Sequence, residues 1–176
     1  ELSLFNQGKN PFVFERNEHG HVVVVITGLD LTGAQEIERL EAARYRLSDY
    51  AKSCLLSKKA DGYDKNHRLV ANQSYKFAIV PGKEIEQNSD RTTENLRKLA
   101  ADKYGYGKPL AGGIPRIREA VSDKQMEDMG VRYIAALHDP IKDSDGDPYV
   151  LYSRRNDGGR WVRAGWGNPD GRWYDG

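Results

Sequence analysis

The sequence predicts an α+β fold, in which a mostly antiparallel β-sheet is made of an N-terminal hairpin and a C-terminal β-meander, with several helices inserted between them. The strongest observation is a set of three apolar runs at residues 131–138, 148–154 and 159–166. The segments between these runs are rich in Asp, Asn and Gly, the residues that tight turns require. Runs of β-branched and aromatic residues between such turns predict a meander of neighbouring strands.

The N-terminal region predicts the hairpin. Residues 12–16 and 21–27 are short runs on either side of a turn signal at residues 17–20. Residues 22–26 are apolar at every position, which predicts a central strand that is covered on both faces.

Two helices are expected after this hairpin. Thr32 followed by Gln35 fits a capping box, in which the two side chains satisfy backbone N–H groups at the start of a helix. Ser48 is placed to cap a second helix over residues 49–56, on whose buried face Cys54 lies.

The middle of the chain continues with one strand and further helices. Residues 75–80 predict a strand, and Asp90 or Thr92 is placed to cap a helix over residues 93–104. Ser122 begins a second capping box, so a last short helix should precede the meander.

Length and composition limit the possible classes of protein. The 176 residues are enough for one domain, which we expect over residues 12–176 after a loose polar lead-in at residues 1–11. With 27 basic and 26 acidic residues and a pI near 8.1, the overall charge gives no nucleic-acid signature. No apolar run approaches the roughly 18 residues that a membrane helix needs, so no membrane partner is expected. The single cysteine excludes an intrachain disulfide and favours a reducing, cytoplasmic compartment.

The C-terminal meander is the first candidate site, because it interleaves basic and aromatic side chains that often dominate contact surfaces. Strand alternation places Trp161 and Arg163 on one face, and Arg160 and Trp166 on the other. We therefore expect one tryptophan to be buried in the core and another to be exposed. The candidate binding residues of the meander are Arg154, Arg155, Arg160, Trp161, Arg163, Trp166, Arg172 and Trp173.

The acidic loop before the second meander strand is the next candidate. Asp143, Asp145 and Asp147 alternate, and alternating carboxylates can converge on Ca²⁺. The loop lacks the glycine position and the final Glu of an EF-hand, and the same residues are those expected of a hairpin turn. Together with His138, the loop is also the basis for an alternative interpretation as a metal-dependent hydrolase or nuclease.

A third candidate is the glycine-rich segment at residues 105–115. It contains Lys108 and precedes a predicted helix, which suggests an anion-binding patch. It matches neither the phosphate-binding P-loop nor the dinucleotide-binding glycine pattern, so a plain connection is the simpler interpretation.

The function favoured by the sequence is a non-enzymatic binding domain whose contact surface is the meander, with Lys108 as a possible second patch. A protein partner is preferred over a glycan or a nucleic acid because the overall charge is mild. Apart from the candidate calcium site no cofactor is expected, and no nucleophile or zinc motif supports catalysis. A third interpretation is a structural component of a larger assembly, since Glu1 and Gly176 both look like cut ends.

Overall fold

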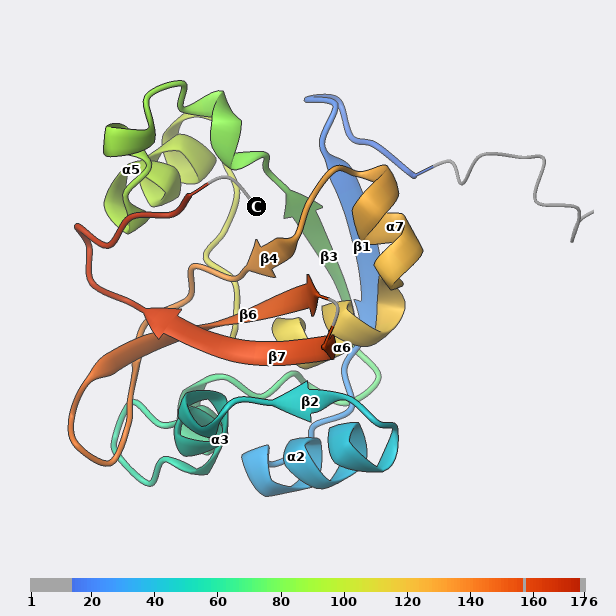
Figure 1. Cartoon of the computed structure of the whole chain (residues 1–176), viewed down its shortest axis with the longest axis vertical. Coiled ribbons are helices and arrows are strands. Elements are labelled where there is room, and N and C mark those ends of the chain that lie inside the picture. The colour runs from blue at the N-terminus through green and yellow to red at the C-terminus, as the bar shows by residue number, and fades with distance from the viewer. Residues whose placement is uncertain (1–13, 157, 175–176) are drawn as a thin grey trace, which may run out of the picture.

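The C-terminal meander supplies most of the strands of the larger of the two sheets in the described residues (Figure 1). Strands β4 (Tyr133–Ala135), β6 (Pro148–Asn156) and β7 (Gly159–Trp166) pair antiparallel, and the short β5 (Ile141–Lys142) pairs with the start of β6. This computed structural model describes residues 14–156 and 158–174, so the predicted lead-in at residues 1–11 lies outside the described part of the chain. The α+β fold and the meander predicted from the sequence are confirmed.

A strand that the sequence did not indicate extends this sheet. Strand β2 (Arg46–Leu47) pairs parallel to β7, with Arg46 opposite Trp161 and Leu47 opposite Val162. Two residues are too few to show the alternation from which strands are recognised, so β2 could be found only from the tertiary structure.

The second sheet differs from the prediction. Strand β1 (Val22–Thr27) pairs antiparallel with β3 (Ser74–Ile79), which comes about fifty residues later in the sequence. Within the described residues β3 is the only full strand beside β1, and Val25 is 48% exposed. The prediction of a central, doubly covered strand was therefore wrong, because an all-apolar run of this length does not reveal how many neighbours it has. The hairpin turn at residues 17–20 does form, and Arg16 makes a single bridge to Val22.

The helix starts follow the capping residues closely. Thr32 and Ser122 each form the reciprocal capping box with the glutamine three residues later, and Ser48 and Thr92 cap their helices through the side-chain oxygen. The helices are α2 (Gly33–Ala42), α3 (Asp49–Leu56), α4 (Tyr63–Asn66), α5 (Thr93–Lys98), α6 (Gly113–Ala120) and α7 (Asp123–Asp128), with 3₁₀ turns η1 (Gly82–Glu84) and η2 (Asn88–Asp90) and a π-helical turn η3 (Leu99–Lys103) that continues α5.

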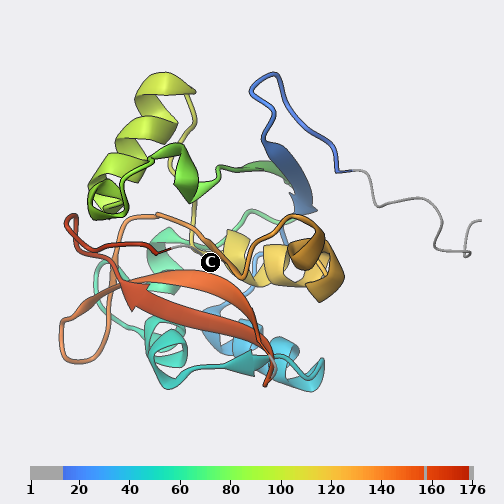
Figure 2. The ribbon, with the colours of Figure 1, turned by 45° about the horizontal axis from the view of Figure 1, so that its top comes forward.

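The main core lies between one face of the larger sheet and helices α2, α3 and α6. Leu40, Leu55 and Ile114 of these helices pack with Leu151 of β6 and Val162 of β7 in one buried cluster. In both ribbon views the sheet lies between α2 and α3 on one side and the α5 region on the other (Figures 1 and 2). The opposite face of the sheet is therefore not covered by the helices that form the core.

None of the helices in the described ranges is long and apolar enough to cross a membrane.

Candidate binding surface

The face of the larger sheet opposite the main core carries a concentrated set of arginine and aromatic side chains. Residues directly opposite each other in paired strands share a face, so the strand register defines the set. Leu151 and Val162 belong to the core face, which places their neighbours in sequence on the other side. We call this set the arginine–aromatic face, and it consists of Arg46, Tyr133, Tyr152, Arg154, Trp161 and Arg163.

Four of these residues form one row across the sheet. Arg46 of β2 lies opposite Trp161 of β7, Trp161 lies opposite Arg154 of β6, and Arg154 lies opposite Tyr133 of β4. Adjacent strands are about 4.8 Å apart, so the row is about 14 Å long. The guanidinium of Arg163 lies 4.5 Å from the centre of the Trp161 ring and that of Arg46 lies 5.5 Å from it. These contacts hold flat, cationic groups against a flat aromatic group.

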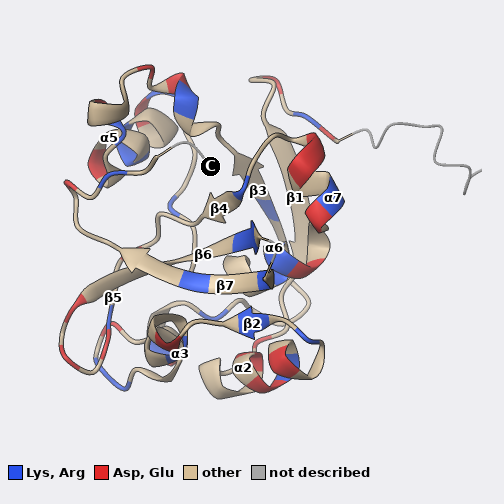
Figure 3. Ribbon diagram, viewed as in Figure 1, with Lys and Arg blue, Asp and Glu red and all other residues tan. Residues whose placement is uncertain are grey.

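The arginines of this face are not neutralised by the rest of the described chain. None of the ion pairs within residues 14–156 and 158–174 includes Arg46, Arg154 or Arg163. The Nε atoms of Arg154 and Arg163 are also buried without a hydrogen-bond partner. Figure 3 shows that acidic residues gather on the outer helices α2, α5 and α7 and on the turn before β6, whereas β2, β6 and β7 carry basic residues. The chain is nearly neutral as a whole, but this face is cationic.

The C-terminal segment, residues 167–174, packs beside the arginine–aromatic face. After β7 the chain turns back, and the N–H of Thr93 donates to the carbonyl of Gly171 while the N–H of Trp173 donates to the carbonyl of Arg91, each at 2.9 Å. The indole N–H of Trp173 also donates to the hydroxyl of Thr93, at 2.9 Å. These three bonds fix the Trp173 ring in front of the sheet.

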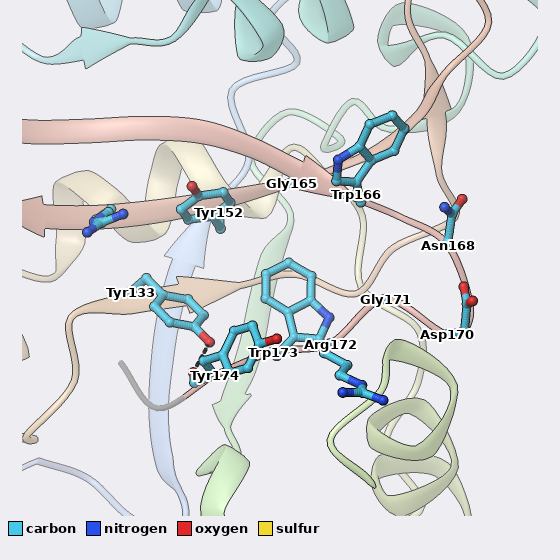
Figure 4. Close-up of a pocket in the computed structure, with 11 residues that line it drawn as sticks. Tyr133, Tyr152, Gly165, Trp166, Asn168, Asp170, Gly171, Arg172, Trp173 and Tyr174 are labelled. Atoms are coloured by element: carbon cyan, nitrogen blue, oxygen red, sulfur yellow. Dashed lines mark hydrogen bonds between the residues drawn. The ribbon is translucent and has the colours of Figure 1, made fainter. Parts of the chain in front are cut away.

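The C-terminal segment and the sheet together line an open cavity of about 570 Å³ (Figure 4). Trp173 lies 6.0 Å from Tyr133 and 6.3 Å from Tyr152, measured between ring centres. Gly165 forms part of the lining, and a Cβ atom there would lie 3.3 Å from Cη2 of Trp173 and 3.4 Å from Cε1 of Tyr152. The missing side chain at Gly165 therefore lets the Trp173 ring approach the sheet. Trp166, Asp170 and Arg172 also contribute to the lining.

Some of the residues selected from the sequence belong to this surface and others do not. Arg154, Trp161 and Arg163 lie on the arginine–aromatic face, whereas Arg172 and Trp173 reach its cavity through the C-terminal segment. Two tyrosines, Tyr133 and Tyr152, and Arg46 were missing from that selection. The tyrosines follow from strand alternation once β4 and β6 are aligned, but Arg46 had no signal in the sequence.

Arg155 and Arg160 face the other way. Arg155 donates from Nε to the carbonyl of Val131 at 3.2 Å. Arg160 donates to the carbonyl of Ala43 at 3.0 Å and lies 4.1 Å from the centre of the Tyr45 ring. Both guanidinium groups therefore make contacts that stabilise the fold.

The three tryptophans were expected to divide between core and surface, and the structure confirms an exposed tryptophan but not a buried one. Trp161 and Trp173 are partly buried and Trp166 is 53% exposed, so none of them fills the core. Small and aliphatic side chains of β7, chiefly Val162, occupy that space instead. Trp166 stacks on the buried Tyr149, with 5.1 Å between ring centres, and lies at the end of the cavity.

Lys108 is separate from this surface. Its ammonium group forms a 2.7 Å ion pair with Asp139 beside a second cavity, which His67 and Asp61 also line. No residue of the arginine–aromatic face lines that second cavity.

The acidic loop is a tight turn between β5 and β6. Oδ1 of Asp143, a residue only 4% exposed, accepts the backbone N–H groups of Asp145, Gly146 and Asp147 at 2.9 to 3.0 Å. Gly146 has a φ of +94°, which glycine adopts without strain. Within the described ranges no three side chains of metal-binding type come together. The geometry therefore gives no support to the calcium site at Asp143, Asp145 and Asp147.

His138 is engaged in the fold by both ring nitrogens. The N–H of Leu151 donates to Nε2 at 2.9 Å, and Nδ1 lies 2.7 Å from the carbonyl oxygen of Asp139, to which it must donate. Burial lowers the pKa of His138 to about 3, so its ring is neutral. A neutral histidine with both nitrogens occupied has no lone pair left for a metal, and the hydrolase interpretation loses its proposed ligand.

Cys54 is fully buried, and burial raises the pKa of its thiol to about 12. A thiol that stays protonated and has no access to solvent is not a nucleophile.

Comparisons with protein-family models, with curated proteins and with solved structures found no match to this chain.

Proposed function

We propose that the chain is a non-enzymatic binding domain that contacts an anionic partner through the arginine–aromatic face. The observation that carries this proposal is a set of three arginines, Arg46, Arg154 and Arg163, which lie beside aromatic rings on a sheet face that the core helices do not cover. Within residues 14–156 and 158–174, none of these arginines forms an ion pair.

The incomplete hydrogen bonding of Arg154 and Arg163 has an energetic cost. A partly buried guanidinium without a full set of hydrogen bonds lowers the stability of the folded chain. Stability is commonly lost in this way where a surface serves binding. Carboxylates and phosphates are the groups that satisfy a guanidinium best, because they accept two parallel N–H bonds.

The nature of the partner follows from this face more than from the whole chain. The overall composition favoured a protein partner because the net charge is only +1. The acidic residues that the structure describes lie mainly on other elements (Figure 3), and none of them forms an ion pair with Arg46, Arg154 or Arg163. A partner with negative charge and flat or apolar groups therefore fits the face best.

The test removes two charges from the face and, as a control, two charges from elsewhere. The face variant carries Arg154→Gln and Arg163→Gln, and the control carries Lys65→Gln and Lys124→Gln at exposed positions of α4 and α7. On immobilised heparin and on polyglutamate, the face variant should elute at clearly lower salt than the control, although both have lost the same charge. Its melting temperature should change little, because neither arginine forms an ion pair with a described residue and the loss of the Arg163–Trp161 contact is small. Equal elution of the two variants would contradict the proposal.

A further inference from the structure

Building on the proposed function, we infer that the anionic partner is a single-stranded nucleic acid, whose phosphates meet the arginines of the face while a base enters the cavity beside Trp173. Three features of the surface support this partner over an acidic protein segment.

The first feature is the alternation of charge and flat surface. Along the row across the sheet, Arg46, Trp161, Arg154 and Tyr133 alternate cationic and aromatic groups. A nucleic acid strand alternates phosphates and planar bases, which stack on aromatic rings and on guanidinium planes. A run of carboxylates would satisfy the arginines but has no planar ring to enter the aromatic cavity beside Trp173.

The second feature is the cavity at the end of the face. At about 570 Å³ it lies within the size range of pockets for small organic ligands. Rings of Tyr133, Tyr152, Trp166 and Trp173 line it (Figure 4), and each is a stacking surface for a planar heterocycle. Arg172 and Asp170 add a donor and an acceptor at the same opening, so polar edges of a base can be bonded there.

The third feature is the shape of the surface. An open sheet about 14 Å across is broad enough for splayed bases, as in other sheets that bind two or three bases of a single strand. In a duplex the bases are stacked inside and only their edges are accessible, so the aromatic cavity would remain empty. The surface therefore favours a single strand over a duplex.

The mild overall charge is consistent with a short contact. Each phosphate neutralised in a single strand contributes about 0.7 to the slope of log affinity against log salt. Three arginines, Arg46, Arg154 and Arg163, predict a slope of about −2, and Arg163→Gln should reduce its magnitude by about 0.7. Stacking, which depends little on salt, supplies the rest of the affinity.

The experiment is a fluorescence-anisotropy titration with labelled oligothymidylate and oligouridylate strands of about 12 nucleotides, a length that typical single-strand sites accept. Three probes serve as comparisons: an abasic strand of equal length, a duplex of equal length, and polyglutamate of matched charge. Both oligonucleotides should bind more tightly than the three comparison probes.

Variants separate stacking from charge. Trp161→Ala should weaken oligonucleotide binding about 5- to 100-fold, the loss expected for one stacked base, and Trp161→Phe should restore most of it. Tyr50→Ala is a control for general loss of aromatic surface, because Tyr50 is an exposed residue of α3 outside the arginine–aromatic face. This variant should change the affinity less than about twofold. In the unmodified protein, tryptophan fluorescence should be quenched by the oligonucleotide and not by the abasic strand, a measurement that needs no variant.

The outcomes distinguish the two proposals. Equal binding of the abasic strand and the oligonucleotide, both weakened by the Arg154→Gln and Arg163→Gln pair, would overturn the nucleic-acid inference and leave an anion-binding face. Tighter binding of polyglutamate would also overturn it, in favour of an acidic protein segment. If no anionic probe depends on the arginine pair, the inference and the proposed function both fail.

Discussion

The buried histidine His138 makes the stability of the fold dependent on pH in a predictable direction. In the folded chain burial holds the pKa of His138 near 3, whereas an unfolded histidine has a pKa of about 6.5. Between these two values the unfolded state binds a proton that the folded state does not bind. Stability is therefore complete above about pH 6.5 and decreases as the pH falls, by about 1.4 kcal/mol for each pH unit. At pH 5 the expected loss is about 2 kcal/mol.

This loss can be measured by urea denaturation at about pH 7.5 and about pH 5 for the unmodified chain and for His138→Gln. The variant loses the titrating group and one of the two backbone contacts, so it should be less stable at neutral pH, by about 1 to 3 kcal/mol. Its free energy of unfolding should then fall about 2 kcal/mol less than that of the unmodified chain between the two pH values. The difference between the chains isolates His138, because other groups, including His67, titrate in both. Equal pH dependence would refute the reasoning, as would an NMR titration in which the His138 ring takes up a proton between pH 8 and pH 5.

Three further predictions concern the turn, the core and the thiol. Asp143→Ala should lower the melting temperature by roughly 4 to 8 °C, because three N–H groups lose a charged acceptor worth about 2 kcal/mol, whereas Asp145→Ala should have almost no effect. A calcium-dependent rise in melting temperature that either substitution abolishes would contradict the turn interpretation. Gly33→Ala should prevent normal folding, since its Cβ would lie 1.8 Å from the carbonyl oxygen of Leu55, and circular dichroism would reveal a native-like variant if this is mistaken. Cys54 should react with a thiol reagent only after unfolding, and rapid labelling of the native chain at neutral pH would show that the thiol is accessible.

Local sequence patterns were sufficient where the structure depends on neighbours in the chain. The caps at Thr32, Ser48, Thr92 and Ser122 lie where the sequence predicts them, because a cap and its helix are only a few residues apart. The helix from Thr93 continued beyond Lys98 only as a π-helical turn, a departure that no local pattern indicated.

The candidate surface could be predicted only in part. Strand alternation correctly placed Trp161 and Arg163 together, since side chains of one strand alternate in direction. It did not indicate which of the two faces packs against the core helices. Two of the four selected arginines of β6 and β7 therefore lie on the core side, where they stabilise the fold. Arg155 and Arg160 look the same in the sequence as Arg154 and Arg163. They differ in the face of the sheet on which they lie, and therefore in the groups that their guanidinium ions contact.

The sequence by itself determined the fold class, the meander and the starts of the main helices, because each of these follows from interactions between residues close in the chain. Only the tertiary structure decided that β1 pairs with β3, that Arg46 joins the sheet through β2, and that Trp173 closes a cavity by returning through Thr93 and Gly171. These contacts join residues separated by roughly fifty to more than a hundred positions, and their formation depends on how the whole chain packs. The arginine–aromatic face exists for the same reason: burial of Leu151 and Val162 against the helices leaves the alternate side chains of their strands on the other side.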